Sequence, residues 1–440
     1  MDTPPRLAVD RLLDDRETRI IVCCGAGGVG KTTTAAALGV RAAGRGRKAV
    51  VLTIDPARRL AQSMGIDVLD NTPRKVETVG AGDGELHAMM LDMKRTFDEI
   101  VEAHADGERA RAILANPFYQ SLSAGFAGTQ EYMAMEKLGQ LRAQDDWDLI
   151  IVDTPPSRSA LDFLDAPKRL GSFLDGKFIR VLMAPAKVGG RAGMKFLNVG
   201  MSMMTGTLSK LMGASLLKDV QTFVAAMDTM FGGFRTRADA TFRLLQAPGT
   251  AFLVVAAPEA DALREAAYFV ERLAAESMPL AGLVLNRVHG SGADQLSAER
   301  ALAAAENLEE GGIVDQESGK AGLRDSGAEP KGTAETAGSA ETAQTAHSTR
   351  TTRTANPPET GSPGTEGDTA VVDRITAGLL RLHAERMQVI AREQRTRDRF
   401  TSLHPEVAVA EVAALPGDVH DLAGLRAIGE RLAAGVPAGA

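Results

Sequence analysis

The residues best suited to chemistry form a glycine-rich loop near the start of the chain. The segment GAGGVGKTT fits the spacing G-x-x-x-x-G-K-[ST] and lies between an apolar run and a helix-like stretch. Glycines let the backbone curl so that several N–H groups converge on a phosphate, and the N-terminus of the following helix adds partial positive charge. The loop therefore predicts a nucleotide-phosphate site, with backbone contacts from Gly25, Gly27, Gly28, Val29 and Gly30.

Three side chains at the end of this loop are suited to act on phosphates. Lys31 stands where an ammonium group reaches the β- and γ-phosphate oxygens. The hydroxyl of Thr32 would be a ligand of Mg²⁺ bridging these phosphates, and Thr33 would touch the α-phosphate. A glycine-rich turn without a ligand is the alternative, which the order of strand, loop, Lys-Thr and helix disfavours.

Two aspartates follow later apolar runs. Asp55 comes after VVLTI and Asp153 ends LIIVD. Because parallel strands open at one edge of a sheet, both acids are expected near the phosphate loop. Asp153 is the predicted Mg²⁺ ligand, directly or through water, and Asp55 would orient or deprotonate an attacking water. Taken singly, either acid could instead be the N-cap of a helix.

Seven short apolar runs provide the elements that must position these residues. Each has strand length and β-branched content without clean polar alternation, which is typical of parallel strands buried on both faces. With helical stretches between them, they predict an α/β fold, a doubly wound and mostly parallel sheet. The runs are Arg19–Cys24, Lys48–Ile54, Glu85–Leu91, Asp148–Asp153, Thr250–Ala257, Ala281–Asn286 and Val407–Leu415.

Two stretches interrupt this pattern. Residues 167–248 contain eight of the seventeen methionines, interleaved with glycines, and predict an inserted helical subdomain with mobile joints. Residues 315–370 contain only Leu323 among Leu, Ile, Val, Met and the aromatic residues, which predicts a disordered insertion. The remaining sections are an N-terminal extension at 1–18, two parts of the core at 19–166 and 249–314, and a helix, last strand and closing segment at 371–440.

Composition excludes several classes of function. Fifty basic against fifty-seven acidic residues, with 4% aromatics, disfavour a nucleic-acid partner. The chain contains no apolar run long enough to span a membrane, and its start lacks the apolar core of a signal peptide, so we expect a cytoplasmic protein. Cys23 and Cys24 are adjacent and predict buried core thiols, and the seven histidines show no metal-ligand spacing.

Four segments resemble motifs of the ArsA family of ATPases. GAGGVGKTTTAAALG, TIDPARRL, WDLIIVDTPPSRSALDFL and LVLNRV are similar to its phosphate loop, first switch, second switch and adenine-binding segment. The family includes arsenical-pump-driving ATPases and ATPases that target tail-anchored membrane proteins. The resemblance implies a P-loop NTPase that binds ATP and Mg²⁺, hydrolyses ATP, and acts as a nucleotide-switched dimer on a protein or membrane-associated client.

The same resemblance implies roles for individual residues. Asp55 would be the acid of the first switch that acts on water, and Asp153 the acid of the second switch near Mg²⁺. Asn286, Pro416 and Gly417 would contact adenine, the last two within LPGDVHDLAGL. The methionine-rich segment could form an apolar groove for a hydrophobic client helix, or be an ordinary helical core.

The sequence also departs from the family pattern. Ala26 stands at the position of the signature lysine that crosses a dimer interface to the partner's phosphates, and Ser157, Arg158 and Ser159 replace a Gly-His-Thr. We therefore expect either a homodimer or a heterodimer with a paralogue that retains the lysine. Arg58 and Arg59 could supply local charge instead. The alternative function is a weakly hydrolysing regulatory subunit, an interaction module in complex with a paralogous ATPase.

Overall fold

The computed structural model describes residues 5–54, 59–77, 84–123, 129–155, 233, 236–310 and 365–434. It divides the chain into two compact units, one comprising 1–294 with 388–440 and the other comprising 295–387. The larger unit contains the sheet and the candidate site. The smaller one contains a pair of helices.

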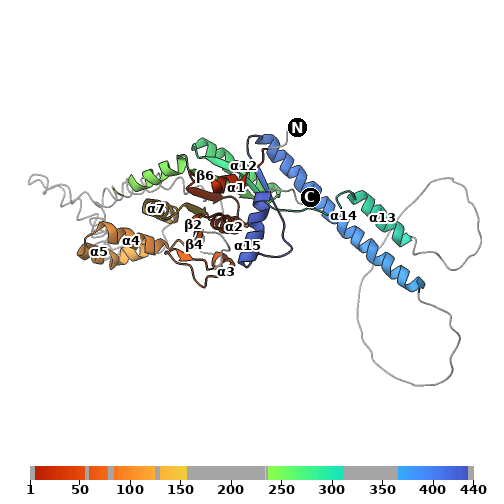
Figure 1. Ribbon diagram of the computed structural model, residues 1–440, viewed down its shortest axis with the longest axis horizontal. Helices are drawn as coiled ribbons and strands as arrows, with labels where there is room; N and C mark the ends of the chain where they lie inside the picture. Colours follow the sequence, from red (N-terminus) through yellow and green to blue (C-terminus); the bar gives the residue numbers. More distant parts are fainter. Residues whose placement is uncertain are drawn as a thin grey trace, which may run out of the picture. The chain divides into compact units, whose positions relative to one another are not determined.

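An eight-stranded sheet forms the centre of the larger unit, in the order β3-β4-β2-β5-β1-β6-β7-β8. Figure 1 labels strands β2, β4 and β6 of this sheet. Neighbouring strands are parallel throughout, except that β3 is antiparallel to β4. All seven predicted strands are confirmed, and the two-residue β3 is the addition. The strands are β1 Ile20–Cys24, β2 Lys48–Thr53, β3 Arg74–Lys75, β4 Glu85–Met90, β5 Leu149–Asp153, β6 Thr250–Ala256, β7 Leu280–Val288 and β8 Val409–Ala413.

Alternating side chains of the strands enter two apolar clusters, one on each face of the sheet. In β1, Ile20 and Val22 belong to one cluster and Ile21 to the other. The first cluster also takes in α4 (Met93–His104), α7 (Thr129–Gln144) and α12 (Ala260–Ala275). The second takes in α1 (Val9–Asp14), α2 (Lys31–Gly44) and α15 (Leu422–Ala434). Helices thus cover both faces, which confirms the predicted doubly wound architecture.

The N-terminal residues 5–18 belong to this core. Leu7 N–H donates to Val409 O at 3.0 Å, and Val409 N–H donates to Pro5 O at 2.8 Å, so the segment pairs with the edge strand β8. The buried guanidinium of Arg47 donates to the carbonyls of Leu13 and Asp15 at 3.1 Å. It also donates to the carbonyls of Thr18, at 2.6 Å, and Asp148. The predicted extension is therefore attached to the sheet at both of its ends.

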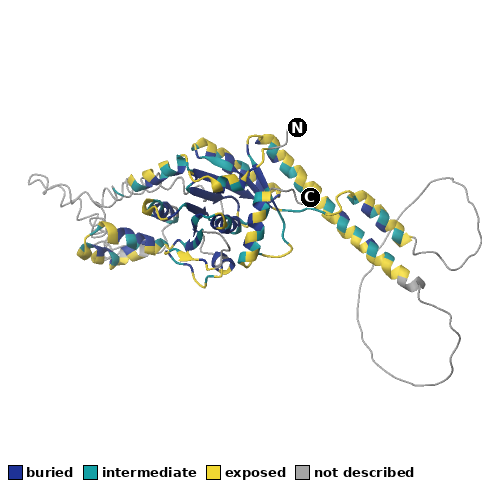
Figure 2. Cartoon of the chain, in the orientation of Figure 1, coloured by how far each residue is buried: buried dark blue, intermediate teal, exposed yellow. Residues whose placement is uncertain are grey.

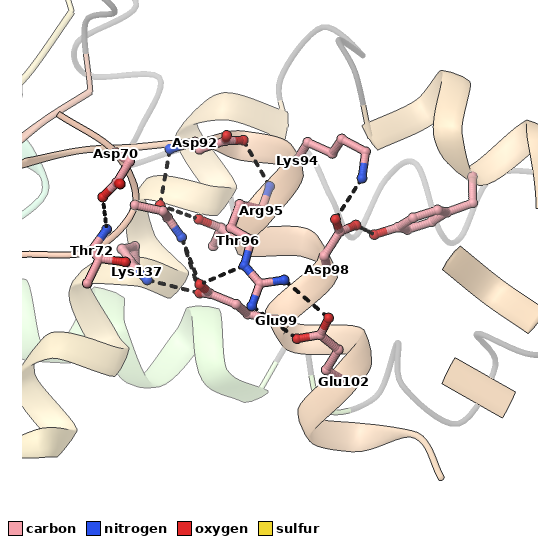
Figure 3. Close-up of polar contacts among 12 residues, drawn as sticks. Asp70, Thr72, Asp92, Lys94, Arg95, Thr96, Asp98, Glu99, Glu102 and Lys137 are labelled. Atoms are coloured by element: carbon pink, nitrogen blue, oxygen red, sulfur yellow. Dashed lines mark hydrogen bonds and ion pairs between the residues drawn. The ribbon is translucent and has the colours of Figure 1, made fainter. Parts of the chain in front are cut away.

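A polar network joins the helices on the first face, where α5 (Gly107–Leu114) and α6 (Pro117–Ser123) lie beside α4, and α4 packs against α7. Glu99 accepts hydrogen bonds from Lys137 Nζ at 2.9 Å and from Asn71 Nδ2 at 3.2 Å (Figure 3). Asn71 Oδ1 in turn accepts from Thr96 Oγ1 and Asp92 N–H, both at 3.1 Å. These bonds fix α4 and α7 relative to the loop that follows α3 (Arg59–Ser63).

The two predicted insertions fall largely outside the described residues. Of the methionine-rich segment 167–248, residues 236–246 form a helix that leads into β6. Of the segment 315–370, residues 365–370 are helical, because α14 begins at Thr365 and runs to Leu403. The rest of that predicted insertion lies outside the described residues.

The smaller unit pairs α13 (Ala298–Glu310) with the first part of α14. Ala301 and Ala305 of α13 are buried, as are Ala377 and Ala384 of α14. Arg381 pairs with Glu309 at 2.5 Å on one side of this contact. The fully buried residues described in these two helices are all alanines, apart from those of α14 that belong to the larger unit.

Candidate functional site

The glycine-rich loop occupies the turn between β1 and α2, as the motif requires. Gly25 has φ +146°, and a Cβ there would lie 2.0 Å from the carbonyl oxygen of Val255. Gly30 has φ +94°, and a Cβ there would lie 2.3 Å from Asn286 Nδ2. Both positions therefore require glycine, for backbone conformation and for space.

Lys31 is the first residue of α2, and its side chain is 6% exposed. Its Nζ donates to the carbonyl of Ala26 at 2.8 Å and to that of Gly25 at 3.1 Å. The ammonium group thus lies across the loop that the helix N-terminus closes. Positive charge and backbone N–H groups meet at this end of α2, an arrangement suited to an anionic phosphate.

Asp153 brings together oxygen atoms from three elements. Its Oδ2 accepts a hydrogen bond from Thr32 Oγ1 of α2 at 2.7 Å and from Thr53 Oγ1 of β2 at 2.9 Å. The carboxyl group is fully buried at the end of β5. Carboxylate and hydroxyl oxygens are the ligands that Mg²⁺ prefers, so this donor set fits that ion.

A cavity of about 1010 Å³ opens beside the loop. Its volume suits a ligand the size of a nucleotide. It brings together residues that were predicted separately along the chain: Gly28, Gly30, Lys31, Thr32, Thr33, Asn286, Pro416 and Gly417. Sequence reasoning missed the other polar residues of its wall, which are Gln62, Ser63, Thr154, Arg287, His289, Asp418 and His420.

The end of β7 shapes one wall of the cavity. Asn286 is buried, and its Nδ2 donates to the carbonyl of Val29 at 2.8 Å, which ties the strand to the glycine-rich loop. The pairing of β7 with β8 shifts register between Asn286 and Val288, and Arg287 there has φ +63°. Beyond the shift, His289 Nδ1 lies 2.6 Å from Glu393 Oε1 of α14. A bulge of this kind redirects side chains, here at the rim of the cavity.

Several predicted positions lie outside the described residues. They include Asp55 and Arg58, and also Ser157, Arg158 and Ser159. The backbone immediately before Asp55 is described, and the carbonyl of Ile54 accepts a hydrogen bond from Gln130 Nε2 at 2.9 Å. Ala26 is described and buried, so the position of the family's signature lysine holds a methyl group inside the loop.

Both cysteines are buried in the core, as predicted. Burial raises the pKa of the Cys24 thiol to about 12 and that of Cys23 well above its ordinary value. Neutral thiols of this kind are poor ligands for metals and metalloids. Within the described ranges, histidine, cysteine and acidic side chains form no group of three or more suited to a metal ion. None of the described helices is long and apolar enough to cross a membrane.

The family model described as anion-transporting ATPase, ArsA_ATPase, matches residues 18–310. The chain belongs to the ArsA family of ATPases. The matched residues extend from the start of the core to the end of α13 and include the loop, Asp153 and Asn286. Family membership confirms the resemblance seen in the four sequence segments, and it places this ArsA-family chain among the P-loop ATPases.

Three relatives illustrate the extent of the likeness. The chain is 30% identical over 167 residues to the ATPase GET3 of Malassezia globosa, covering 38% of this chain and 47% of that protein. It is 26% identical over 298 residues to the ATPase GET3 of Podospora anserina, covering 66% and 80% respectively. It is 28% identical over 189 residues to a putative arsenical pump-driving ATPase of Halobacterium salinarum, covering 41% and 28%. The chain thus spans about half the length of the first relative and most of the second.

Proposed function

We propose that this ArsA-family chain binds Mg²⁺ and ATP and hydrolyses ATP, with release of the γ-phosphate. The observation that carries the proposal is the convergence at one cavity of the glycine-rich loop, Lys31 and Thr32, with the buried Asp153 carboxylate bonded to the Thr32 hydroxyl directly behind the cavity wall. These groups stem from the loop, α2 and β5, and together they provide positive charge for phosphate and oxygen ligands for a cation.

Thr32 and Asp153 would hold the Mg²⁺ ion, which when bound neutralises charge on the β- and γ-phosphates. The loop N–H groups donate hydrogen bonds to the phosphate oxygens and so stabilise the negative charge that develops on the leaving group. Lys31 would exchange the carbonyls of Gly25 and Ala26 for phosphate oxygens, so that its ammonium group stabilises the negative charge on the transferred phosphoryl group. Asp55 is proposed to orient the attacking water or to accept a proton from it.

The base would lie beside the loop, in the part of the cavity formed by the ends of β7 and β8. Asn286, Pro416 and Gly417 line the wall there, and they are the proposed adenine contacts. Because Asn286 also binds the carbonyl of Val29, a change in its contact with the base would be transmitted directly to the phosphate loop.

ATP hydrolysis is also proposed to drive a conformational cycle that acts on a client. Supported by family membership, we infer a nucleotide-switched dimer that acts on a protein or membrane-associated client. Ala26 supplies no charge at the position of the signature lysine, so a paralogue that retains that lysine is the proposed partner in a heterodimer. The alternative is a weakly hydrolysing regulatory subunit. In that case the ATP site of this chain would turn over slowly even when the paralogue is present.

Steady-state ATPase assays and calorimetric ATP titrations test this proposal. The parent chain should bind Mg-ATP, Lys31→Ala should bind it at least about tenfold more weakly, and Asp55→Asn should bind it but lose most turnover. Lys94→Ala, on the exposed surface of α4, is the matched control and should behave as the parent. A parent chain without affinity for ATP, or a Lys31→Ala variant with unchanged turnover, contradicts the proposal.

A second assay adds the paralogue. The chain alone should hydrolyse ATP slowly, and addition of a partner with the signature lysine should accelerate turnover, because a charge at the γ-phosphate stabilises the transition state. Acceleration that is lost when the partner's lysine is changed to alanine supports the heterodimer. Full activity of the chain as a lone homodimer contradicts it.

A further inference from the structure

One helix bears most of the exposed apolar side chains in the part of the chain that the structure describes. Of nine large hydrophobic residues that are exposed there, seven belong to α14. Figure 2 shows that much of this helix is exposed. Five of them lie within three turns and have 53–63% of their surface exposed: Val371, Val372, Ile375, Leu379 and Leu382. We call these five residues the outer stripe. The proposed ATPase site makes no use of it.

The outer stripe is a second apolar face of a helix whose first face is already covered. Ala377 and Ala384 are buried in the contact with α13, whereas Leu379 and Leu382 point to the other side of α14. The stripe residues at 372, 375, 379 and 382 follow steps of three, four and three. This repeat of 3.5 residues matches the seam of a two-helix coiled coil, so the surface is shaped for another helix.

The segment that links α13 to α14 has the wrong composition to cover this stripe. Between residues 315 and 364 its one large apolar residue is Leu323, and the rest is mainly Ala, Thr, Gly, Ser and Glu. A seam of five apolar residues needs a matching seam on its partner. The outer stripe of a second copy provides such a seam. We propose that α14 self-associates through the outer stripe, antiparallel to α14 of a second copy of this chain.

Charge favours the antiparallel arrangement. Arg386 is four residues beyond Leu382 and continues the repeat, so a parallel pair would place it against the partner's Arg386. An antiparallel pair centred near Ala377 aligns Val372 with the partner's Leu382 and moves Arg386 past the end of the partner's stripe. On one flank of the stripe, the exposed Arg374 then approaches the partner's Glu385, and the symmetry repeats this pair.

Gly378 supports the same arrangement. It lies in the interior of α14 and is exposed, and a Cβ at this position would have no described atom within 4 Å. Packing among the described residues therefore does not require glycine at this position. Glycine in the interior of a helix lowers its stability, so another reason for it is expected. In the antiparallel pair Gly378 lies beside the two-fold axis, where a missing Cβ allows the two helices to approach closely.

Sedimentation of the full chain tests the surface. We expect a reversible monomer–dimer equilibrium without nucleotide, and we expect Leu379→Glu to weaken it at least tenfold. Gln388→Glu adds the same charge on an exposed position of α14 away from the stripe and should leave the equilibrium unchanged. Lys31→Ala should also dimerise normally, which separates this surface from the proposed ATP site. A chain that stays monomeric, or a Leu379→Glu variant that still dimerises, overturns the proposal.

Crosslinking tests the orientation. Ile375→Cys and Leu379→Cys are made separately in a background of buried, unreactive Cys23 and Cys24, and the two variants are mixed and oxidised. The antiparallel pair predicts that the 375–379 crosslink between chains exceeds the 375–375 crosslink. Predominance of 375–375 overturns the antiparallel arrangement. Absence of both crosslinks in a dimeric sample would place the contact between chains elsewhere and overturn the outer stripe as the interface.

Discussion

At the scale of single residues, Asp153 is the group on which the candidate site depends most. The sequence predicts it because an acid ends the apolar run LIIVD. Thr53 was missed, although it too is polar at the end of an apolar strand, because the pairing of β2 with β5 decides that the two side chains meet. A sequence motif thus identifies a single site residue such as Asp153. Which side chains contact it depends on how the strands pair, and the motif does not show that.

Thr53→Val tests the contribution of that neighbour. Valine keeps the shape of the side chain but removes a hydrogen bond of 2.9 Å to a buried carboxylate. We expect a loss of about 1–3 kcal/mol in the free energy of unfolding and weaker Mg-ATP binding. Urea unfolding measures the first and calorimetry the second. Thr396→Val, which removes a hydroxyl bonded within α14, is the control and should leave ATP affinity unchanged.

The buried thiol of Cys24 makes stability depend on alkaline pH. Its pKa is raised to about 12 by burial, whereas the thiol titrates near its ordinary value in the unfolded chain. The protonated thiol therefore stabilises the fold fully below about pH 8.5, and the contribution falls as pH rises through 9 to 12. The free energy of unfolding of the parent minus that of Cys24→Ala should fall by up to about 1.4 kcal/mol per pH unit. A difference that is flat between pH 8.5 and 10.5 contradicts this linkage.

At the scale of elements, the apolar runs were sufficient to predict every long strand, since strands buried on both faces need uninterrupted apolar sequence. They were not sufficient for β3, whose two residues Arg74 and Lys75 are exposed and carry no apolar signal. The attachment of residues 5–18 to the sheet was also missed. It depends on backbone pairing with β8 and on carbonyls that accept from Arg47, and neither leaves a pattern in the sequence.

Arg47→Met tests how the N-terminal segment is held. The substitution keeps much of the apolar stem but leaves the carbonyls of Leu13, Asp15, Thr18 and Asp148 without their charged donor. We expect a loss of about 3 kcal/mol in the free energy of unfolding, because several buried acceptors lose a partner at once. Hydrogen exchange at Leu7 and Val409 should accelerate. Arg45→Ala, which removes partly exposed ion pairs with Asp10 and Asp14, should cost less than about 1 kcal/mol.

Gly378→Ala separates two effects on α14. Alanine should stabilise the helix by about 0.5–1 kcal/mol, because it lowers the backbone entropy of the unfolded chain. The added methyl group should at the same time weaken self-association, because it lies at the closest approach of the two helices. Thermal unfolding and sedimentation of the same variant measure the two effects. Stronger dimerisation of Gly378→Ala would contradict the placement of this residue at the helix contact.

At the scale of the whole molecule, the fold explains why residues far apart in sequence meet at one cavity. Strands β1, β2, β5 and β7 run parallel, so the segments that follow them open at the same edge of the sheet. The residues that the sequence singles out in the glycine-rich loop therefore line one side of the cavity. The wall formed by the end of β7 was predicted only in part. A register shift there orients the side chains of Arg287 and His289, and such a shift has no sequence signature.

Ligand binding should stabilise the larger unit as a whole, because the cavity is lined by segments from both ends of the chain. Mg-ATP at about one hundred times its dissociation constant should raise the free energy of unfolding by about 2.7 kcal/mol. Lys31→Ala should abolish this increase at the same ATP concentration, and Asp55→Asn should retain it. Hydrogen exchange should slow in β1, β5 and β7 but remain unchanged in the outer stripe, since the proposed self-association does not require nucleotide. Slower exchange in the stripe on addition of ATP at constant dimer fraction would show that the two surfaces are coupled.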